Sequence, residues 1–427
     1  MGSEAVEAGA VATITRRAAD RVRGGHLWVY RSDIERLTSA AADEIPGGGL
    51  LSVADNRGIA LGSAIYSAQS EIALRMVSRQ PGLSRAGYLA DLSERILAAI
   101  ELRERLVPLA FRGTGSVADN ACRLIFSEAD DLPGIVADRY NGLVVVQLLT
   151  QATARDDVRA VVTEVLARQP WVEIVVERPD ARMRELEHLG PPPDAPLFMR
   201  KAQQAETALS AIFAINGLSF HYDAAAGQKT GAFLDQRLNY AAAASYARGR
   251  ALDVCTYQGG FALHLAQTCD RVTGVDASRA ALEVADRNFA LNPALRAKVD
   301  WLEADAFELL RDFADRAAVD PGQCFDTVVL DPPAFAKSKR AAEGAMRGYK
   351  ELNLRAMKML GRGGTLITCS CSHHVATEDF LEVVRSAAID AGRRVQMLEC
   401  RGAAPDHPAI LTLPETSYLK CLILRVG

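Results

Sequence analysis

The sequence predicts an α/β protein, in which a doubly wound parallel sheet follows a small all-β module and a small mixed α/β domain. Its 427 residues are enough for about three domains at roughly 150 residues each. Hydrophobic residues make up 49% of the chain and charged residues 24%, so the chain can bury sizeable cores. From Arg250 onward, apolar strand-like runs alternate with runs of helical spacing, which is the pattern of a sheet with parallel order.

Residues 12–80 are expected to form a compact β-barrel. Alternating runs from Leu50 to Ala54, Ile59 to Tyr66 and Ile72 to Val77 are separated by Gly and Asn turns. Between Ile14 and Arg31, five arginines and one aspartate are interleaved with aromatic residues, which makes this the most basic stretch of the chain. The net charge of −4 excludes a protein that coats nucleic acid with its whole surface, so an RNA partner is expected to meet this local patch. The candidate phosphate-binding residues are Arg16, Arg17, Arg21 and Arg23, with a solvated surface face as the alternative.

Residues 83–205 are expected to form the small central α/β domain. Its expected elements are a helix over Tyr88–Arg105, two strand-like stretches between Arg123 and Thr150 split by the turns DDLPG and DRYNG, a helix over Asp156–Arg168 and a strand over Trp171–Glu177. The Pro-rich stretch at 190–196 then interrupts the pattern. It predicts a domain boundary between this stretch and about residue 215.

The third domain, residues 206–427, carries the alternation of strands and helices. Four strand-like runs are each followed by a helical run: ALDVCT, RVTGVDAS, FDTVVLDPP and TLITCSCS. The last two strand-like runs, RVQMLECR and YLKCLILRV, have no helix between them and predict a terminal antiparallel pair. The expected sheet is therefore Rossmann-like, and ligands of such sheets bind at the carboxyl ends of the strands.

The end of the first of these strands carries a glycine turn. Asp253 lies in the strand, Tyr257 lies in the turn, and Gly259 and Gly260 open the next helix. Glycine at this point allows a ligand to approach the backbone closely and leaves helix amides free to bind it. The order of the glycines does not match the GxGxxG of dinucleotide dehydrogenases, and no basic cluster follows them, so a pyrophosphate is not expected.

Two further carboxylates end the next strands. Asp276 closes the second strand, where a carboxylate can bind both hydroxyls of a ribose, and Asp305 ends the third, where it can accept from an adenine amino group. One such Asp alone is more often an ordinary helix N-cap, but three at successive strand ends favour a ligand site. Acidic strand ends without phosphate ligands suit S-adenosyl-L-methionine, a nucleoside with a positively charged sulfonium and no phosphate.

A rigid loop follows the fourth strand. In Asp331-Pro332-Pro333 the prolines fix the backbone and remove donors, so the loop presents the Asp331 carboxylate and nearby carbonyls above the sheet edge. Such a loop can hold a planar base by its amino edge, and a structural loop terminator is the alternative. Lys337 and Lys339 follow in a short basic run that suits phosphate contact, although a solvated loop would look the same.

The fifth strand ends with two cysteines and two histidines. Strand alternation predicts Cys369, Cys371 and His373 on one face, with Cys371 nearer the carboxyl end. A metal site is disfavoured because no second Cys/His cluster is visible. A buried thiol is plausible for Cys369 and less so for Cys371. The remaining interpretation is a nucleophilic thiolate, which needs local positive charge or a helix end. Methylation of an amino group needs no cysteine, whereas methylation at carbon 5 of a pyrimidine does.

No apolar run reaches the roughly eighteen residues that span a bilayer, and the first dozen residues carry two glutamates in place of a basic segment. The chain is therefore expected in the cytoplasm, without a membrane partner. The sequence leaves open whether the protein forms a homodimer.

Taken together, several motifs resemble the bacterial ribosomal RNA large-subunit methyltransferase I family. They are GGHLWVY, RLIFSEADDLPGIVADRY, GQKTGAFLDQR, DVCTYQGGF, DPPAF and SCS, and they cover nearly the whole chain. The resemblance implies an N-terminal PUA domain, a central α/β domain and a C-terminal methyltransferase domain that makes 5-methylcytosine in large-subunit ribosomal RNA. It also implies that Cys371 is the nucleophile.

The same resemblance assigns roles to further residues. Asp276, Asp305 and Asp331 match the ribose, adenine and base-facing positions, and Lys229, Thr230 and Phe233 lie in the stretch beside the cofactor. The expected activity is methylation of an RNA cytosine at carbon 5, with the base turned out of its stack. One alternative is methylation of an exocyclic amino group on the same fold. The other is a non-catalytic RNA-binding or ribosome-assembly protein.

Overall fold

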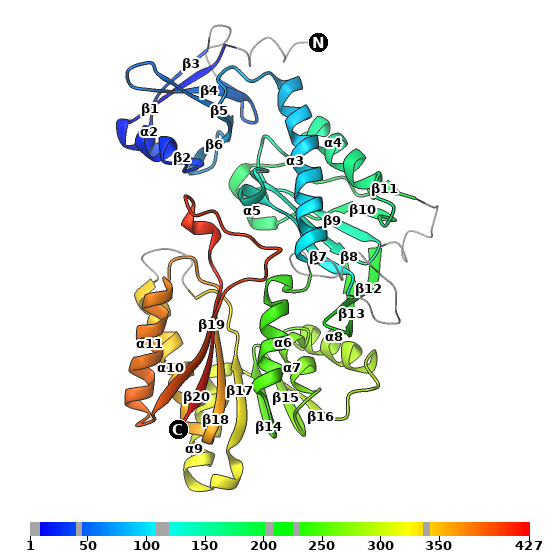
Figure 1. The fold of residues 1–427 in the computed structure, drawn as a ribbon, viewed down its shortest axis with the longest axis vertical. Coiled ribbons are helices and arrows are strands. Elements are labelled where there is room, and N and C mark those ends of the chain that lie inside the picture. Colours follow the sequence, from blue (N-terminus) through cyan, green and yellow to red (C-terminus); the bar gives the residue numbers. More distant parts are fainter. Residues whose placement is uncertain (1–8, 40–44, 108–118, 201–208, 225–230, 336–341) are drawn as a thin grey trace.

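The computed structural model describes residues 9–39, 45–107, 119–200, 209–224, 231–335 and 342–427. Three units follow one another along the chain and along the longest axis of the molecule (Figure 1). The predicted α/β class and the Rossmann-like sheet are confirmed. No helix in the described ranges is long and apolar enough to cross a bilayer.

The N-terminal module is a curled sheet of six strands in the order β2-β6-β5-β4-β1-β3 (Figure 1). The strands are β1 (Val11–Ile14), β2 (Trp28–Tyr30), β3 (Ile34–Thr38), β4 (Leu50–Asp55), β5 (Ala60–Tyr66) and β6 (Ile72–Ser78). The expectation of an all-β module was wrong at one point, because the basic stretch contains helix α2 (Arg16–Arg23). Thr15 caps this helix by accepting a hydrogen bond from the backbone N–H of Ala18, and Ala18 and Ala19 are buried.

The central domain is a five-stranded sheet in the order β11-β10-β9-β8-β7. Its elements are α3 (Arg85–Leu106), β7 (Ala121–Phe126), β8 (Ile135–Tyr140), β9 (Leu143–Leu148), α4 (Asp156–Ala167), β10 (Ile174–Glu177), α5 (Ala181–Glu187) and β11 (Phe198–Met199). Three strands lie where two strand-like stretches were expected, because the Asn141-Gly142 turn separates β8 from β9. The Pro-rich stretch leads into the short edge strand β11, which pairs with β10.

A hairpin of β12 (Ser210–Ile215) and β13 (Leu218–Asp223) joins the central and C-terminal domains, and it lies outside the elements that the sequence predicted. Its two-residue turn, Asn216-Gly217, has positive φ angles of 51° and 77°. On one side, Tyr222 of β13 stacks on Tyr140 of β8 with ring centroids 4.2 Å apart. On the other side, the backbone N–H of His221 donates to Asn288 of the C-terminal domain.

The C-terminal domain is a seven-stranded sheet in the order β16-β15-β14-β17-β18-β20-β19. The strands are β14 (Arg250–Val254), β15 (Arg271–Asp276), β16 (Lys298–Glu303), β17 (Phe325–Leu330), β18 (Leu360–Ser370), β19 (Val395–Arg401) and β20 (Lys420–Val426). The first five are parallel and β20 is antiparallel to both neighbours, so the predicted terminal pair is confirmed. The strand order reverses at β14, and the carboxyl ends of β14 and β17 therefore mark the expected ligand crevice.

Helices cover both faces of this sheet. They are α6 (Arg237–Tyr246), α7 (Gly260–Leu265), α8 (Arg279–Ala290), α9 (Ala306–Val319), α10 (Ala342–Met359) and α11 (Thr377–Asp390). Buried side chains of α9, α10 and α11 form one core with the sheet, and those of α6 and α7 form another. The sheet is thus buried on both faces, as its nearly continuous apolar strands require.

The loop between β19 and β20, residues 402–419, reaches from the C-terminal sheet toward the other two units (Figure 1). Asp406 accepts from the backbone N–H of Arg123 in the central domain, at 3.0 Å. The hydroxyl of Thr412 donates to the carbonyl of Gly25 in the N-terminal module, at 2.9 Å. One loop therefore ties all three units together.

Candidate active site

A cavity of about 640 Å³ lies at the carboxyl ends of the parallel strands. Strand-end residues that were predicted as site residues line it, namely Asp276, Asp305, Asp331 and Cys371. The central domain contributes Arg123, and the β19–β20 loop contributes His407 and Tyr418. The cavity therefore needs both domains, which no local motif indicates.

Asp253 lies beneath the glycine turn and is not among the residues that line this cavity. Its carboxylate accepts from the hydroxyl of Thr256 at 2.5 Å and from the backbone N–H of Ala262 at 2.8 Å. Burial raises the pKa of Asp253 to about 7. Asp253 thus shapes the turn and the start of α7, and a direct cofactor contact of this residue stays a prediction.

The glycines of the turn pack against the protein itself. Gly259 has a φ of +86°, and a Cβ at Gly260 would lie 2.6 Å from the ring of Tyr240. Close approach of Tyr240 therefore requires glycine at position 260, whether or not a ligand does.

Asp276 and Asp305 line the cavity, and their carboxylates also accept hydrogen bonds from backbone N–H groups. The two oxygens of Asp276 accept from the backbone N–H groups of Tyr257 and Ser278, both at 2.9 Å. One oxygen of Asp305 caps α9 by accepting from the N–H groups of Phe307 and Glu308. The sequence left open whether such an Asp caps a helix or binds a ligand. One side chain can do both, because the Asp305 carboxylate caps α9 and also lines the cavity.

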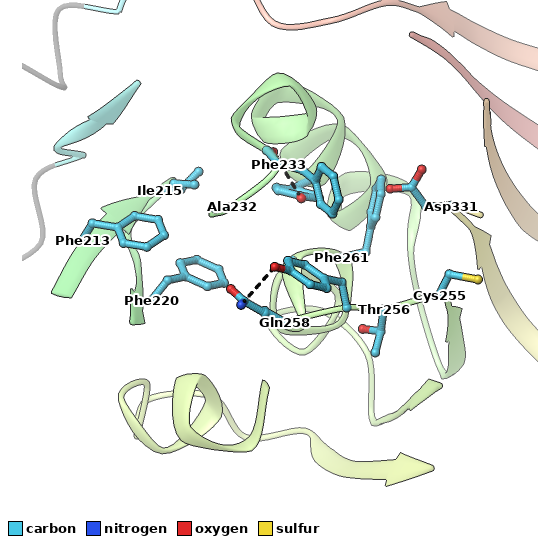
Figure 2. Close-up of a pocket in the computed structure, with 13 residues that line it drawn as sticks. Phe213, Ile215, Phe220, Ala232, Phe233, Cys255, Thr256, Gln258, Phe261 and Asp331 are labelled. Carbon is cyan, nitrogen blue, oxygen red and sulfur yellow. Dashed lines mark hydrogen bonds between the residues drawn. The ribbon is translucent and has the colours of Figure 1, made fainter. Parts of the chain in front are cut away.

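A second, much smaller pocket of about 30 Å³ adjoins the large cavity. Figure 2 shows Phe213 and Phe220 of the hairpin on one side of it and Cys255 and Asp331 on the other. Phe233 borders both cavities and meets the ring of Tyr257 edge to face, with centroids 5.2 Å apart. The small pocket has room only for a water-sized group, so a nucleoside fits the large cavity alone.

A chain of buried polar side chains holds Asp331. Gln236 donates to the Asp331 carboxylate at 3.1 Å, Asn239 donates to Gln236 at 2.7 Å, and Arg401 donates to Asn239 at 2.9 Å. Gln236 and Asn239 are almost fully buried. Sequence reasoning missed both as site residues, although Gln236 lies in the stretch GQKTGAFLDQR. This chain fixes the carboxylate above the sheet edge.

The two cysteines have different surroundings. Cys371 lines the cavity, and its sulfur lies 4.0 Å from the carbonyl oxygen of Pro332. Cys369 is fully buried opposite Cys421 in the neighbouring strand, and burial raises its pKa well above the ordinary value. β18 ends at Ser370, so Cys369 lies within the strand and Cys371 lies directly after it, and the expectation that both share one face stays a prediction.

The predicted RNA-binding arginines lie on α2 or at its end, in the N-terminal module (Figure 1). Arg16 and Arg17 are exposed. Arg21 pairs with Asp33 at 2.5 Å, and Arg23 pairs with Asp55 and Asp20. Lys229, Thr230, Lys337 and Lys339 lie outside the described residues.

The carboxylates at the strand ends fit S-adenosylmethionine. Asp276 and Asp305 offer acceptors for a ribose and an adenine amino group, and their negative charge, with that of Asp331, suits a sulfonium. Within the described ranges, no cluster of three or more His, Cys, Asp or Glu side chains could hold a metal ion.

Family models match two parts of the chain. A PUA-like domain model matches residues 12–79, and an S-adenosylmethionine-dependent methyltransferase model matches residues 129–425. Proteins named Ribosomal RNA large subunit methyltransferase I match 94% of the chain over 95% of their own length. Identity is 35% for the Erwinia tasmaniensis protein, 36% for that of Shewanella denitrificans and 33% for that of Escherichia coli.

Solved structures share the fold. The protein SMU.776, described as a methyltransferase in complex with SAH, aligns with a TM-score of 0.77 at 17% identity over 97% of this chain and 100% of its own. A structure described as an S-adenosylmethionine-dependent methyltransferase from Streptococcus mutans aligns with the same TM-score at 18% identity, with the same shares of both chains.

Fold, cavity and family model together define an S-adenosylmethionine-dependent methyltransferase with an N-terminal PUA-like domain, and S-adenosylmethionine is its cofactor. Within that class, the chain belongs to the ribosomal RNA large subunit methyltransferase I family. The resemblance drawn from the sequence motifs is confirmed.

Proposed function

We propose that this protein methylates carbon 5 of a cytosine in large-subunit ribosomal RNA through a covalent adduct with Cys371. The observation that carries the proposal is a thiol in the cavity that the strand-end carboxylates also line. Amino-group methylation has no use for this thiol, whereas a pyrimidine carbon must first be activated by a nucleophile. The names of the relatives support ribosomal RNA as the substrate.

In the proposed reaction, the thiolate of Cys371 adds to carbon 6 of a cytosine that has been turned out of its stack, a step that costs a few kcal/mol and least for unpaired RNA. Asp331, held by Gln236, accepts a hydrogen bond from the amino group of the cytosine during the addition. S-adenosylmethionine supplies the electrophilic methyl group that carbon 5 takes. A water or a nearby polar group then takes the carbon-5 proton, and the electron pair of that C–H bond expels the Cys371 thiolate from carbon 6.

Further residues have proposed binding roles. Asp276 and Asp305 bind the ribose and adenine, and Tyr257 and Phe233 form the wall beside them. Lys229 and Thr230 belong to the stretch beside the cofactor. The exposed Arg16 and Arg17 contact RNA phosphates, as do Lys337 and Lys339. The units 12–80, 83–205 and 206–427 act as an RNA-binding module, a central domain and a catalytic domain.

Methylation of an exocyclic amino group is the second candidate, because Asp331-Pro332-Pro333-Ala334-Phe335 also suits a loop that binds an amino group without a covalent step. The two are separated by incubating the protein with methyl-labelled S-adenosylmethionine and naked ribosomal RNA, followed by nucleoside analysis. The proposal expects label in 5-methylcytidine and loss of label with Cys371→Ser. Label in an N-methylated nucleoside would replace carbon-5 chemistry with amino-group chemistry, and no label would favour a non-catalytic protein.

A further inference from the structure

A buried lysine lies next to the proposed nucleophile. Lys420, the first residue of β20, is 5% exposed. Its ammonium donates to the carbonyl oxygens of Ser372, Val375 and Tyr418, each at 2.8 Å. These three bonds use all three donors of an ammonium group. Within the described part of the chain no carboxylate forms an ion pair with it, which is unusual because burial of a charge normally requires a charged partner.

Two of the three carbonyl groups that Lys420 binds, those of Ser372 and Val375, belong to the backbone that follows Cys371, and the third belongs to Tyr418. Ser372 follows Cys371 directly, and the carbonyl of Ser372 also accepts from the N–H of Val375, which closes a turn. Lys420 lies opposite Ser370 in the pairing of β18 with β20. The ammonium therefore ties the turn after Cys371 to the neighbouring strand, just beyond the end of β18.

The charges of the two side chains are coupled. Burial lowers the pKa of Lys420 to about 8, and the negative charge of Cys371 acts in the opposite direction. The coupling is mutual, so the ammonium favours the thiolate. Tyr349 of α10 and Tyr418 also interact with the charge of Cys371, His373 lies on the same turn, and Asp331 faces the cavity from the loop after β17. An ionised Asp331 opposes the thiolate, which makes a nearby cation more important.

We propose that Lys420 is a positioning residue for the nucleophile: its ammonium fixes the turn that carries Cys371 and supplies positive charge that favours the thiolate. The inference rests on the proposed function, in which Cys371 attacks carbon 6. The thiol proton leaves to solvent before the attack, and Lys420 keeps its three protons throughout. Lys420 does not line the cavity, so it acts through Cys371 and not on the RNA base.

The test measures how fast iodoacetamide alkylates Cys371 as a function of pH, with the peptide that contains Cys371 quantified by mass spectrometry. The wild-type midpoint is expected below the ordinary thiol pKa of about 8.5. Lys420→Met keeps the side-chain length and removes the charge, so alkylation at pH 7 is expected to fall about tenfold, which corresponds to a midpoint about one pH unit higher. Lys420→Arg keeps the charge and is expected to restore most of the rate.

Lys350→Met is the matched control, since Lys350 of α10 is only partly buried, pairs with Asp390 of α11 at 2.7 Å and does not line the cavity. It is expected to leave the alkylation profile unchanged. A wild-type midpoint at or above about 8.5 would overturn the inference without any variant, so a failure of Lys420→Met to fold does not matter. An unshifted midpoint in folded Lys420→Met would overturn it as well.

Nucleoside analysis of the same preparations separates this inference from the proposed function. A shifted midpoint without 5-methylcytidine would leave the lysine–thiolate coupling standing and remove carbon-5 chemistry. Production of 5-methylcytidine through Cys371 with an unshifted midpoint in Lys420→Met would support carbon-5 chemistry and remove the lysine–thiolate coupling. The pH profile of methyl transfer is expected to move to higher pH in Lys420→Met, because more of the thiol must then be ionised by the solvent.

Discussion

The strand-end carboxylates differ in what they contact, and this difference determines what their loss should do. Asp253 is buried and bonded to its own turn, whereas Asp276 combines backbone bonds with a place in the cavity wall. Asp305 is more exposed and caps α9 with one oxygen. Asp276 is therefore the carboxylate whose removal should affect the cofactor most directly.

Asp276→Ala is expected to weaken S-adenosylhomocysteine binding by about 1.5–3 kcal/mol, or roughly 10- to 150-fold, because charge-assisted bonds to a ribose are removed. Isothermal titration calorimetry measures it. Asp286→Ala is the control, since Asp286 accepts from Trp301 on the exposed side of α8 and does not line the cavity. Equal affinities for the two variants would show that Asp276 does not hold the ribose.

The sequence indicated that Asp276, Asp305 and Asp331 lie close together, because the carboxyl ends of parallel strands must meet at one edge of the sheet. It did not predict which strand-end residues face the cavity. Gly260 was interpreted as a ligand contact, yet Tyr240 of another helix occupies the space where its Cβ would lie. Burial of Asp253 and contacts such as Gln236 with Asp331 depend on partners distant in sequence, so local pattern cannot show them.

At the level of elements, α7 and the β12–β13 hairpin are joined through a neutral histidine. Nδ1 of His264 donates to the carbonyl of Gly260 at 2.7 Å, and Nε2 accepts from Asn216 of the hairpin turn at 3.0 Å. Burial lowers the pKa of His264 to about 4. The unfolded chain takes up a proton near pH 6.5 while the folded protein does not, so stability is lost as pH falls from about 6.5 to about 4.

His264→Gln is expected to remove this acid sensitivity. Between pH 7.5 and pH 5 the wild type should lose about 2 kcal/mol more of its free energy of unfolding than the variant does. The comparison between variants is needed because Asp253, whose pKa is raised to about 7, contributes with the opposite sign between about pH 4 and 7. Urea unfolding at the two pH values measures the difference, with exposed His374→Gln as the control. An identical pH dependence in His264→Gln and wild type would contradict a neutral buried His264.

The hairpin does carry a signal in the sequence. Asn216-Gly217 stands between two alternating runs, which is typical of a two-residue hairpin turn. Helix α2 was hidden for another reason, since it is short and its arginines dominate the composition while only Ala18 and Ala19 are buried. Strands β14, β15, β17 and β20 were predicted nearly at their observed ends, because they are apolar runs bounded by turns, whereas β18 begins at Leu360, five residues before the predicted run.

In the molecule as a whole, the basic helix and the cavity belong to different units that the β19–β20 loop ties together. Trp28 of the N-terminal module donates to Glu128 of the central domain at 2.9 Å, which adds a second connection. An RNA bound to the module would thus be held at a fixed place relative to the catalytic domain. These hydrogen bonds join residues about 100 to 390 positions apart, so no sequence motif could indicate them.

The arginines of α2 should contribute unequally to RNA affinity. Replacing the exposed Arg16 and Arg17 by Ala is expected to flatten the slope of log affinity against log salt by about 1.4 to 1.8, at roughly 0.7–0.9 for each phosphate that is no longer neutralised. Arg21 and Arg23 are bound to aspartates, so their replacement should lower the stability of the module more than the slope. Filter binding across a salt series measures the slopes, with Arg279→Ala/Arg316→Ala as a control for exposed charge elsewhere. A slope that stays the same without Arg16 and Arg17 would show that α2 is a solvated face.

The central claim is carbon-5 chemistry through Cys371, and trapping with RNA that contains 5-fluorocytidine tests it most directly. Fluorine at carbon 5 cannot be lost as a proton, so the enzyme and RNA should accumulate as a covalent adduct that denaturing gel electrophoresis separates. The adduct is expected with wild type and with Cys369→Ser and is expected to be absent with Cys371→Ser. An adduct that survives Cys371→Ser and disappears with Cys369→Ser would make Cys369 the nucleophile, and methylation that persists in the double variant without any adduct would contradict the account.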